Sequence, residues 1–315
     1  MNTSDHFDGW KFHNLRNVQT SSFSQVPRMM TERGTPWPAQ VPVTPRRPAP
    51  LGAATAIVTF IGHATFLIQT KAGNILTDPI YSNIAGPLNL AGPRRSRAPG
   101  VRFEDLPPIS TILLSHNHYD HCDVRTLRML RKRFNPIVLT PLGNRRVVAK
   151  AGLNKLEELD WWDGATTAAW PVILTPAQHF SARTPFDRNR TLWGSFMLEG
   201  EWPRVFFAAD TGYWRHFTEV RAQFPAIDLA LLPIGAYEPR WFMRPAHMDP
   251  GDAVQAHLDL QARLSVAMHF GTFRLTDEAW DDPPRRLVEA LDTRSVPRDD
   301  FRVLRPGETM IVRAA

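Results

Sequence analysis

The sequence predicts an α+β fold made of two mixed β-sheets flanked by helices. Two observations lead to this prediction. Residues 55–61 and 65–70 are short apolar segments rich in β-branched and aromatic side chains, a pattern typical of a strand hairpin. After residue 134, segments of strand-like and helix-like composition alternate, as expected where helices cover the outer faces of sheets.

Further elements follow in order along the chain. Residues 74–77 form a third strand, and a long loop rich in Gly, Pro and Arg occupies 80–103; loops of that length are usually functional or mobile. Residues 110–115 form a nearly all-apolar strand, the pattern of a strand buried on both faces. Residues 123–134 have helical spacing of apolar side chains, and Asp123 is placed to cap that helix. The remaining predicted strands are 137–139, 172–174, 193–198, 205–208 and 229–232, and the remaining predicted helices are 250–261 and 284–291.

Length and composition limit the classes of protein to which the chain can belong. With 315 residues, of which 43% are hydrophobic, it can form one large domain or two modest ones. No apolar run approaches the roughly 18 residues that span a bilayer, and the polar start has no apolar segment behind it, so we expect a cytoplasmic protein. The net charge of +6 comes from scattered arginines, which fits anionic partners but equally a solvated surface. No signature of a nucleic-acid-binding fold is present, so we expect no nucleic-acid partner.

Proline is concentrated before the first strand. Residues 27–50 contain seven prolines, which fix φ and remove backbone donors, so this stretch should be extended and non-helical. It could be a flexible linker or, because Trp37 and Val41 offer apolar anchors, an arm packed along the domain. We therefore divide the chain into a Pro-rich N-terminal arm, residues 1–50, and one domain, residues 51–315.

Four side chains that bind metals fall within one short segment, His116-Asn117-His118-Tyr119-Asp120-His121. Imidazole nitrogens together with carboxylate oxygens are the donor set of catalytic zinc sites. Residues two apart in an extended segment point the same way, so His116 and His118 can converge on one ion. A turn at Tyr119 then lets Asp120 and His121 reach a second ion.

The four side chains of this segment are too few to complete two metal sites. Three later residues are further candidate ligands. Each directly follows a predicted strand: His179 after 172–178, Asp210 after 205–209, and His269 after 264–268. One such residue is usually part of a turn, but three in succession indicate a binding site, because α/β sheets place ligands at the carboxyl ends of strands. The single cysteine, Cys122, excludes an internal disulfide; it could be a ligand or a nucleophile, but the ligand set beside it favours a small buried residue.

This motif, HxHxDH followed by a later His, Asp and His, resembles the metallo-β-lactamase superfamily. The resemblance implies an αββα sandwich and a site for two zinc ions per chain, or for two other divalent metals. One zinc would be held by His116, His118 and His179, the second by Asp120, His121 and His269, and Asp210 would bridge both together with a water or hydroxide. Asp78 matches the acidic residue that orients a ligand histidine in this superfamily; as part of an Asp-Pro pair it could equally be a plain strand stop.

A closer resemblance is to the N-acylphosphatidylethanolamine-hydrolysing phospholipase D family. It covers about residues 55–273 and is most specific at 237–243, within the segment PIGAYEPRWFM. The other matching blocks are 60–65, 76–79, 116–121, 209–213, His247, 249–250 and 269–273, and residues 5–9 resemble the openings of bacterial members. The resemblance implies a zinc-dependent phosphodiesterase that releases phosphatidic acid and an N-acylethanolamine, and it implies a homodimer.

Under this resemblance, several residues have roles in the reaction. Asp120 and Asp210 would act through the metals, whose bridging hydroxide is the nucleophile. His247 could contact the phosphate or the leaving group; the alternative is a surface histidine after a turn. His63 would contact and orient a metal ligand without binding the metal, or it would have a purely structural role. The candidate substrate-binding residues are Tyr119, Tyr237, Arg240 and Trp241, although aromatic residues in such a run are as often part of the core.

Two other functions stay open, because a shared fold does not fix the reaction. The same hydroxide would serve a lactonase or another ester or amide hydrolase, and the segment at 237–243 argues for the phosphodiesterase. A non-catalytic binding protein usually lacks ligands, whereas all seven are present here. The expected partner is a phospholipid or another small phosphodiester, with peripheral contact to the inner face of a membrane. Trp161-Trp162 and the loop at 80–103 could touch a bilayer, although a buried tryptophan pair is the simpler interpretation.

Overall fold

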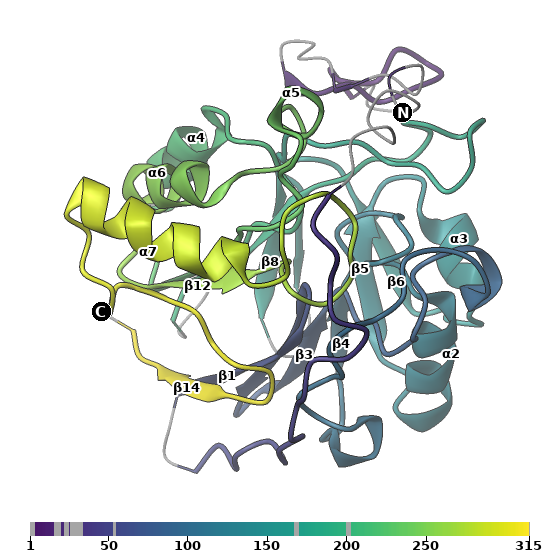
Figure 1. Cartoon of the computed structure of the whole chain (residues 1–315). Coiled ribbons are helices and arrows are strands. Elements are labelled where there is room, and N and C mark those ends of the chain that lie inside the picture. Colours follow the sequence, from purple (N-terminus) through teal and green to yellow (C-terminus); the bar gives the residue numbers. More distant parts are fainter. Residues whose placement is uncertain are drawn as a thin grey trace.

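The computed structural model describes residues 4–15, 20–21, 25, 34–52, 55–166, 170–199 and 203–314. Two seven-stranded β-sheets pack against each other, and helices cover their outer faces (Figure 1). Both sheets contain parallel and antiparallel pairs of strands. The prediction of an α+β fold with two mixed, helix-flanked sheets is therefore confirmed, as is the αββα sandwich that the resemblance implied.

The first sheet contains the predicted hairpin and the strands that follow it. In spatial order its strands are β14 (Thr309–Val312), β1 (Ala56–Gly62), β2 (Thr65–Thr70), β3 (Gly73–Thr77), β4 (Thr111–Leu113), β5 (Ile137–Pro141) and β6 (Leu156–Leu159). Strands β1 to β3 are antiparallel, and β3 to β6 run parallel. Neighbouring residues of β2 enter different cores: Phe66 and Ile68 join the larger core, while Leu67 joins the core that contains α2 (Val124–Arg133).

The second sheet supplies the later strands of the predicted alternation. In spatial order its strands are β13 (Phe301–Arg302), β12 (Ser265–Met268), β11 (Leu229–Pro233), β10 (Val205–Phe207), β9 (Ser195–Leu198), β8 (Pro171–Thr175) and β7 (Gly164–Thr166). Strands β10 to β13 run parallel, so β10, β11 and β12 present their carboxyl ends at the same edge of the sheet. That edge is where ligands bind in sheets of this kind.

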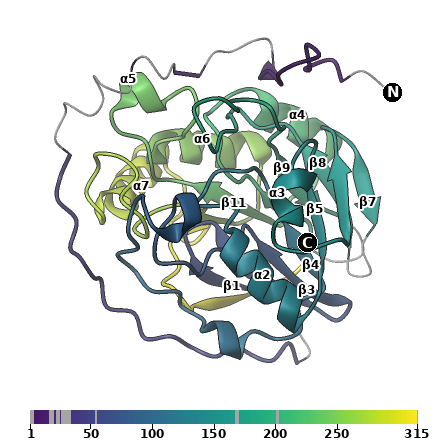
Figure 2. The same ribbon diagram turned by 90° about the vertical axis from the view of Figure 1, so that its right-hand side faces the viewer.

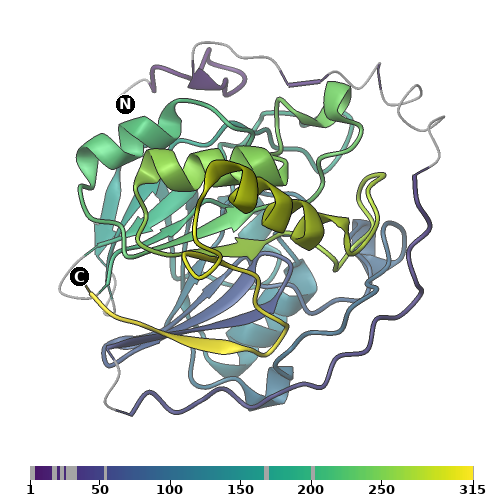
Figure 3. The ribbon, with the colours of Figure 1, turned by 60° about the vertical axis from the view of Figure 1, so that its left-hand side comes forward.

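Helices cover both outer faces of the sandwich. α2 and α3 (Arg145–Ala149) lie on the side of the first sheet, and α4 (His216–Gln223), α6 (Pro250–Leu260) and α7 (Asp282–Arg294) lie on the side of the second (Figures 1 and 3). Leu127 and Leu130 of α2 share a core cluster with Leu76 of β3. α2 begins as predicted, because the Asp123 carboxylate accepts a hydrogen bond from the backbone amide of Arg125.

Several observed elements have no counterpart among the predictions: β6, β7, β13, β14, α3, α4 and the single-turn helix α5 (Arg240–Met243). β6 reads Leu-Glu-Glu-Leu and β13 has two residues, so neither shows an apolar run. The loop at 80–103 is not irregular throughout, since it contains the 3-10 helix η3 (Pro87–Asn89). Trp161 is buried and its indole N–H donates to the carbonyl of Trp193 at 2.7 Å, so the buried interpretation of this tryptophan is confirmed.

The described part of the N-terminal arm lies against the domain. Residues 34–52 run over its outside (Figures 2 and 3), where the Trp37 indole donates a hydrogen bond to the carbonyl of Glu278 at 2.8 Å. Phe12 is buried in the larger core. Pro27 and the rest of 26–33 lie outside the described residues, and the boundary between arm and domain at residue 50 stays a prediction. Among the described residues, no helix is long and apolar enough to cross a bilayer.

Candidate metal centre

Several strands end at one place in the fold and deliver polar side chains there. Asp78 directly follows β3, His116 lies three residues after the end of β4, Asp210 lies three residues after β10, and His269 directly follows β12. The backbone at His63, Asp78 and His269 has φ of 56°, 31° and 58°, in the left-handed region that L-residues seldom occupy. Such conformations persist where surrounding contacts fix them, and they concentrate at functional sites.

The first cluster of candidate ligand atoms comes from His116, His118, His179 and Asp210. Nδ1 of His118 lies 2.8 Å from Nε2 of His116 and 3.2 Å from Nε2 of His179. Oδ2 of Asp210 lies 3.8 Å from that same nitrogen of His179. One ligand atom from each of the four residues lies within 4.8 Å of all the others, a spacing that permits binding of one ion.

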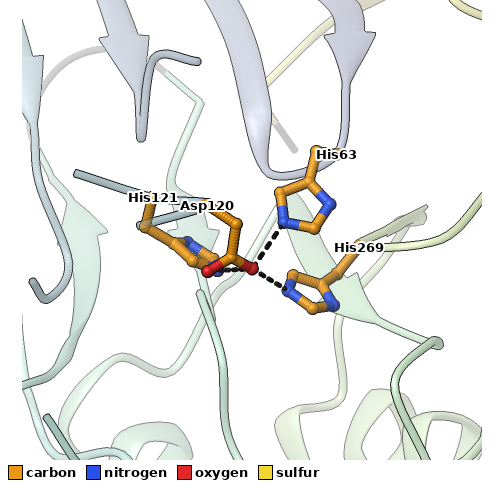
Figure 4. Close-up of side chains that lie close together, drawn as sticks. All are labelled: His63, Asp120, His121 and His269. Atoms are coloured by element: carbon orange, nitrogen blue, oxygen red, sulfur yellow. Dashed lines mark hydrogen bonds and ion pairs between the residues drawn. The ribbon is translucent and has the colours of Figure 1, made fainter. Parts of the chain in front are cut away.

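The second cluster combines Asp120, His121 and His269 with His63 (Figure 4). Oδ2 of Asp120 lies 3.0 Å from Nε2 of His63 and 3.4 Å from Nε2 of both other histidines. Asp210 reaches this cluster too, because its Oδ2 lies 3.1 Å from Nε2 of His121 and its Oδ1 lies 3.1 Å from Nε2 of His269. Asp210 therefore faces both clusters, which is the position that a bridging ligand needs.

The donor atoms fit metal ions better than they fit hydrogen bonds among themselves. Nε2 of His121, Nε2 of His269 and Oδ1 of Asp210 are buried, and their 3.1 Å contacts lack hydrogen-bond geometry, so none of them has a hydrogen-bond partner in the described part of the chain. A buried polar atom without a partner costs about 1–3 kcal/mol, so three of them around one point require an explanation. Metal ions bound between the His and Asp side chains would give each of these atoms a partner.

Asp78 is hydrogen-bonded to one histidine of each cluster, to His121 directly and to His116 through Ser115. Its Oδ2 accepts hydrogen bonds from Nδ1 of His121 at 2.7 Å and from the Ser115 hydroxyl at 2.6 Å. The Ser115 oxygen in turn accepts from Nδ1 of His116 at 2.8 Å. These contacts fix Nδ1 as the donor in both histidines, so the neutral form of each ring leaves Nε2 free to bind a metal. They are the contacts that an orienting residue needs, and the role that the resemblance implied for Asp78 stays a prediction.

A residue of the N-terminal arm, Asn14, holds the backbone of His179. Its side-chain amide donates to the His179 carbonyl at 2.8 Å, and its side-chain oxygen accepts from the His179 amide at 3.0 Å. Nδ1 of His179 donates to the carbonyl of Ala246 at 2.9 Å. Both contacts fix the orientation of a candidate ligand, and neither residue was among the sequence predictions. Asn14 lies 165 residues from His179, so no local pattern reveals the contact.

Arg183 contacts the candidate metal-binding segment, residues 116–121, from its outer side, and it too was missing from the predictions. Its Nη1 donates to the carbonyls of Asn117 at 2.8 Å and Cys122 at 2.9 Å, which bracket the ligands between them. Its guanidinium lies 3.9 Å from the centre of the Tyr119 ring, and the Tyr119 hydroxyl donates to the Arg183 carbonyl at 3.0 Å. The turn at Tyr119 is therefore fixed by contacts in both directions.

Comparison with known proteins assigns this fold and site to a family. The family model of the β-lactamase superfamily domain matches residues 73–270. An uncharacterized protein of Mycobacterium tuberculosis is 37% identical over 249 residues, which cover 78% of this chain and 66% of that protein. The Caenorhabditis elegans protein named N-acyl-phosphatidylethanolamine-hydrolyzing phospholipase D 1 is 35% identical over 257 residues, which cover 76% of this chain and 71% of that protein. This chain belongs to the N-acylphosphatidylethanolamine-hydrolysing phospholipase D-like family of the β-lactamase superfamily.

Solved structures agree with this family at the level of the fold. A possible metal-dependent hydrolase from Veillonella parvula has a TM-score of 0.67 at 15% identity, and the match covers 82% of this chain and 100% of that one. The residues that the resemblance named are brought together in the two clusters described above. The phospholipase D-like chain is a metal-dependent hydrolase of the β-lactamase superfamily.

The two clusters of this phospholipase D-like chain differ in charge when no metal is bound. Burial lowers the pKa of His118 to about 4 and of His179 to about 3, so these rings are neutral. Burial also opposes a charge on His269, but the carboxylates of Asp210 and Asp120 outweigh it and raise its pKa to about 9. The same two carboxylates, again against burial, raise the pKa of His121 well above its ordinary value.

Metal uptake is therefore expected to release protons mainly at the second cluster. His269 is protonated in the metal-free chain below a pH of about 9, and the pKa of His121 is also raised well above its ordinary value, so each must lose a proton to bind a metal. Affinity at this cluster should rise with pH until it passes the pKa of His269, while the first cluster needs little proton release. Titration calorimetry of metal-free protein in buffers of different ionisation enthalpy measures the protons released in each step. Equal release from both steps would contradict this assignment of charge.

The other predicted site residues have different surroundings. His247 is buried, and its Nδ1 lies 4.0 Å from Oδ2 of Asp210, so it borders the metal centre. Tyr237 is fully buried with its hydroxyl hydrogen-bonded to Asp282, a contact that fits a core residue. Trp241 is 38% exposed. Burial raises the pKa of the Cys122 thiol to about 11, which fits a small core residue rather than a nucleophile.

Proposed function

We propose that this chain is a zinc-dependent phosphodiesterase that hydrolyses N-acylphosphatidylethanolamine or a closely related phosphodiester. The observation that carries this proposal is the sharing of Asp210 by two buried His/Asp clusters. The 35% identity to a protein named for this hydrolysis directs the choice of substrate. Under this proposal the substrate partner is a phospholipid reached by peripheral contact with a membrane, and the homodimer implied by the resemblance stays a prediction.

The donor set and its low exposure fit phosphodiester hydrolysis. His nitrogens and Asp oxygens would hold zinc, which when bound supplies a water of lowered pKa and positive charge for the phosphoryl oxygens. The chain itself fixes these donors before substrate arrives, through Asp78, Asn14 and Arg183. Preorganised charge in a buried site is worth far more than the same charge in water, because the surroundings need not rearrange during the reaction.

His247 borders Asp210 and His269 but belongs to neither of the two clusters described above. Its ring packs 5.0 Å from that of His179 and 5.7 Å from that of His269, measured between ring centres. Burial lowers its pKa to about 3, so it is neutral and can donate one hydrogen bond from a ring N–H. Nδ1 has no hydrogen-bond partner among the described residues. We assign His247 to a phosphoryl oxygen or to the leaving group.

Arg240 positions His247 rather than substrate in this arrangement. Its Nη1 donates to the carbonyl of His247 at 3.0 Å, and its other nitrogens contact Asp249 at 3.2 Å and Asp252 at 2.6 Å. These two acids cap the start of α6. Arg240 thus ties α5, the His247 backbone and α6 together.

Arg240→Gln is expected to lower kcat about tenfold, with little change in bound metal, because His247 loses its backbone support. Arg244→Gln is the matched control, since Arg244 is an exposed arginine at the end of the same short helix. Steady-state kinetics and metal analysis of both variants check this prediction. An Arg240→Gln variant that keeps wild-type kcat, or one that loses its metal, would show that this arginine does not act through His247.

The proposed function is tested by incubating zinc-loaded protein with N-acylphosphatidylethanolamine in ¹⁸O-labelled water, followed by mass spectrometry. We expect phosphatidic acid and N-acylethanolamine, with the label in the phosphatidic acid, because water attacks phosphorus. Asp210→Asn is the inactive control. Release of fatty acid instead would indicate an ester hydrolase. An intact lipid, together with hydrolysis of a lactone by the same preparation, would replace the proposal with the lactonase alternative.

A further inference from the structure

A pocket of about 480 Å³ lies on the outer side of the metal-binding segment. It is formed between η3, the start of α2, and α3, which contacts α2 on the same flank of the molecule (Figure 2). None of the candidate metal ligands lines it. We call it the α2–α3 pocket and define it by its charged lining residues Asp123, Arg125, Arg128, Lys150 and Arg183.

The charge of the α2–α3 pocket is strongly positive. Four cations and one acid line it, a net charge of +3. The acid, Asp123, is already engaged: it accepts from the backbone amide of Ser82 at 3.1 Å and from the hydroxyl of Thr126 at 2.6 Å. Its carboxylate therefore serves the helix cap and neutralises the cations only in part. No acidic side chain of the described residues forms an ion pair with Arg125, Arg128 or Lys150.

A second, smaller pocket of about 230 Å³ extends this basic surface. It shares Tyr119, Lys150 and Arg183 with the α2–α3 pocket and adds Arg146. Its one acid, Asp187, accepts hydrogen bonds from the backbone amides of residues 183 and 184 at 2.9 Å and 2.7 Å. The carboxylate of Asp187 is therefore engaged by backbone amides, and the basic surface continues along α3. Gathering like charges in this way is unfavourable unless an anion joins them.

Most of the remaining lining of the α2–α3 pocket is apolar, with Asn89 and Tyr119 as its polar members. Pro87 and Leu88 of η3 line it together with Val124 and Val147, and Leu88 is 87% exposed. A large aliphatic side chain this exposed, beside cations that have no carboxylate partner in the described part of the chain, suits a ligand with an anionic head and an apolar part. The pocket volume lies within the range of small-ligand sites, about 300–1,000 Å³.

We propose that the α2–α3 pocket binds a phosphate monoester, with Arg125, Arg128 and Lys150 as its cationic contacts. A dianionic phosphate matches the net charge better than a singly charged diester does, and guanidinium groups bind phosphate oxygens in pairs. The monoester could be a free small phosphate or the headgroup of a lipid such as phosphatidic acid, whose chains would lie against Leu88. The site is separate from the metal centre, and it does not rest on the proposed phosphodiesterase activity.

Arg183 connects this pocket to the metal centre. It lines the pocket and also donates from Nη1 to the carbonyls of Asn117 and Cys122, at 2.8 Å and 2.9 Å. A phosphate that contacts the guanidinium would therefore touch the same residue that holds the metal-binding segment. Occupancy of the pocket would in this way alter the stability of that segment, and it offers a route by which a phosphorylated ligand adjusts the hydrolase.

Binding is tested by calorimetry on the zinc-loaded full chain with short-chain phosphatidic acid and with inorganic phosphate. The variant Arg125→Gln/Lys150→Gln removes two pocket cations, and Lys132→Gln/Lys155→Gln removes two exposed lysines outside the pocket as the charge-matched control. We expect at least about tenfold weaker binding of phosphatidic acid for the pocket variant and unchanged binding for the control. Tighter binding of the lipid than of inorganic phosphate identifies the headgroup as ligand; equal binding identifies the free anion.

Phosphate could also bind at the metals, so a second measurement locates it. Acylation of lysines in the wild-type chain, with and without phosphatidic acid, is followed by mass spectrometry. Lys150 should be protected by the ligand, while Lys132 should react as before. Unchanged affinity in the pocket variant, or equal reactivity of Lys150 in both conditions, overturns the proposal, whatever the hydrolytic activity of the protein proves to be.

Discussion

Asp210→Asn is expected to reduce hydrolysis by about a thousandfold or more and to lower the content of bound metal. Oδ2 of Asp210 lies 3.1 Å from Nε2 of His121 and 3.8 Å from Nε2 of His179, while Oδ1 lies 3.1 Å from Nε2 of His269. Asparagine keeps the size of the side chain but replaces one oxygen with an NH₂ group, which cannot bind a metal. The variant also lacks the negative charge of the carboxylate, which would balance two bound metal ions. The site is buried, so the loss of this charge has a large effect.

The measurement pairs steady-state kinetics with metal analysis by mass spectrometry. Asp228→Asn is the matched control, because Asp228 is likewise buried and its carboxylate accepts a hydrogen bond from the amide of Arg204 at 2.8 Å, away from the clusters. That variant should keep its metals and its kcat. If Asp210→Asn retained a full complement of metal and more than about a tenth of the activity, the assignment of Asp210 to both clusters would be wrong.

The ligands could be predicted from the sequence because their chemistry is local. His116, His118, Asp120 and His121 stand within six residues, and each later ligand follows a strand that is itself recognisable from its apolar residues. The spacing within 116–121 predicted two ions, but the assignment of His179, Asp210 and His269 to them was implied only by the family resemblance. The spacing alone indicates that side chains converge, and tertiary structure decides which atoms face each other.

The supporting contacts could not be predicted, because they join distant parts of the chain. Asn14 meets His179 across 165 residues, and Arg183 meets Asn117 across 66. A single Asn or Arg in a loop carries no periodic signal, so its partner becomes visible only in the folded chain.

Tyr237 was predicted to bind substrate because it stands in a family-specific segment. In the structure its ring is buried and its hydroxyl contacts Asp282, so a residue of a family-specific segment need not face the substrate.

Asp78→Asn is expected to weaken metal binding at the second cluster about a hundredfold and to lower kcat with it. Oδ2 of Asp78 accepts from both the Ser115 hydroxyl and Nδ1 of His121, at 2.6 Å and 2.7 Å. An amide nitrogen placed at Oδ2 would face two donors. His121 would relieve the conflict by moving its proton to Nε2, the nitrogen that faces Asp120 and Asp210, and that tautomer cannot bind a metal.

A second buried carboxylate separates this effect from a general loss of stability. Asp123 accepts hydrogen bonds from Ser82 and Thr126, at 3.1 Å and 2.6 Å, but touches no candidate ligand. Asp123→Asn should therefore lower the free energy of unfolding by about 1–2 kcal/mol, as Asp78→Asn should, while its metal affinity stays unchanged. Chemical denaturation and competition with a zinc chelator measure the two quantities separately. If both variants lost metal equally, packing of the metal-binding segment would explain the loss, and the His121 tautomer would not.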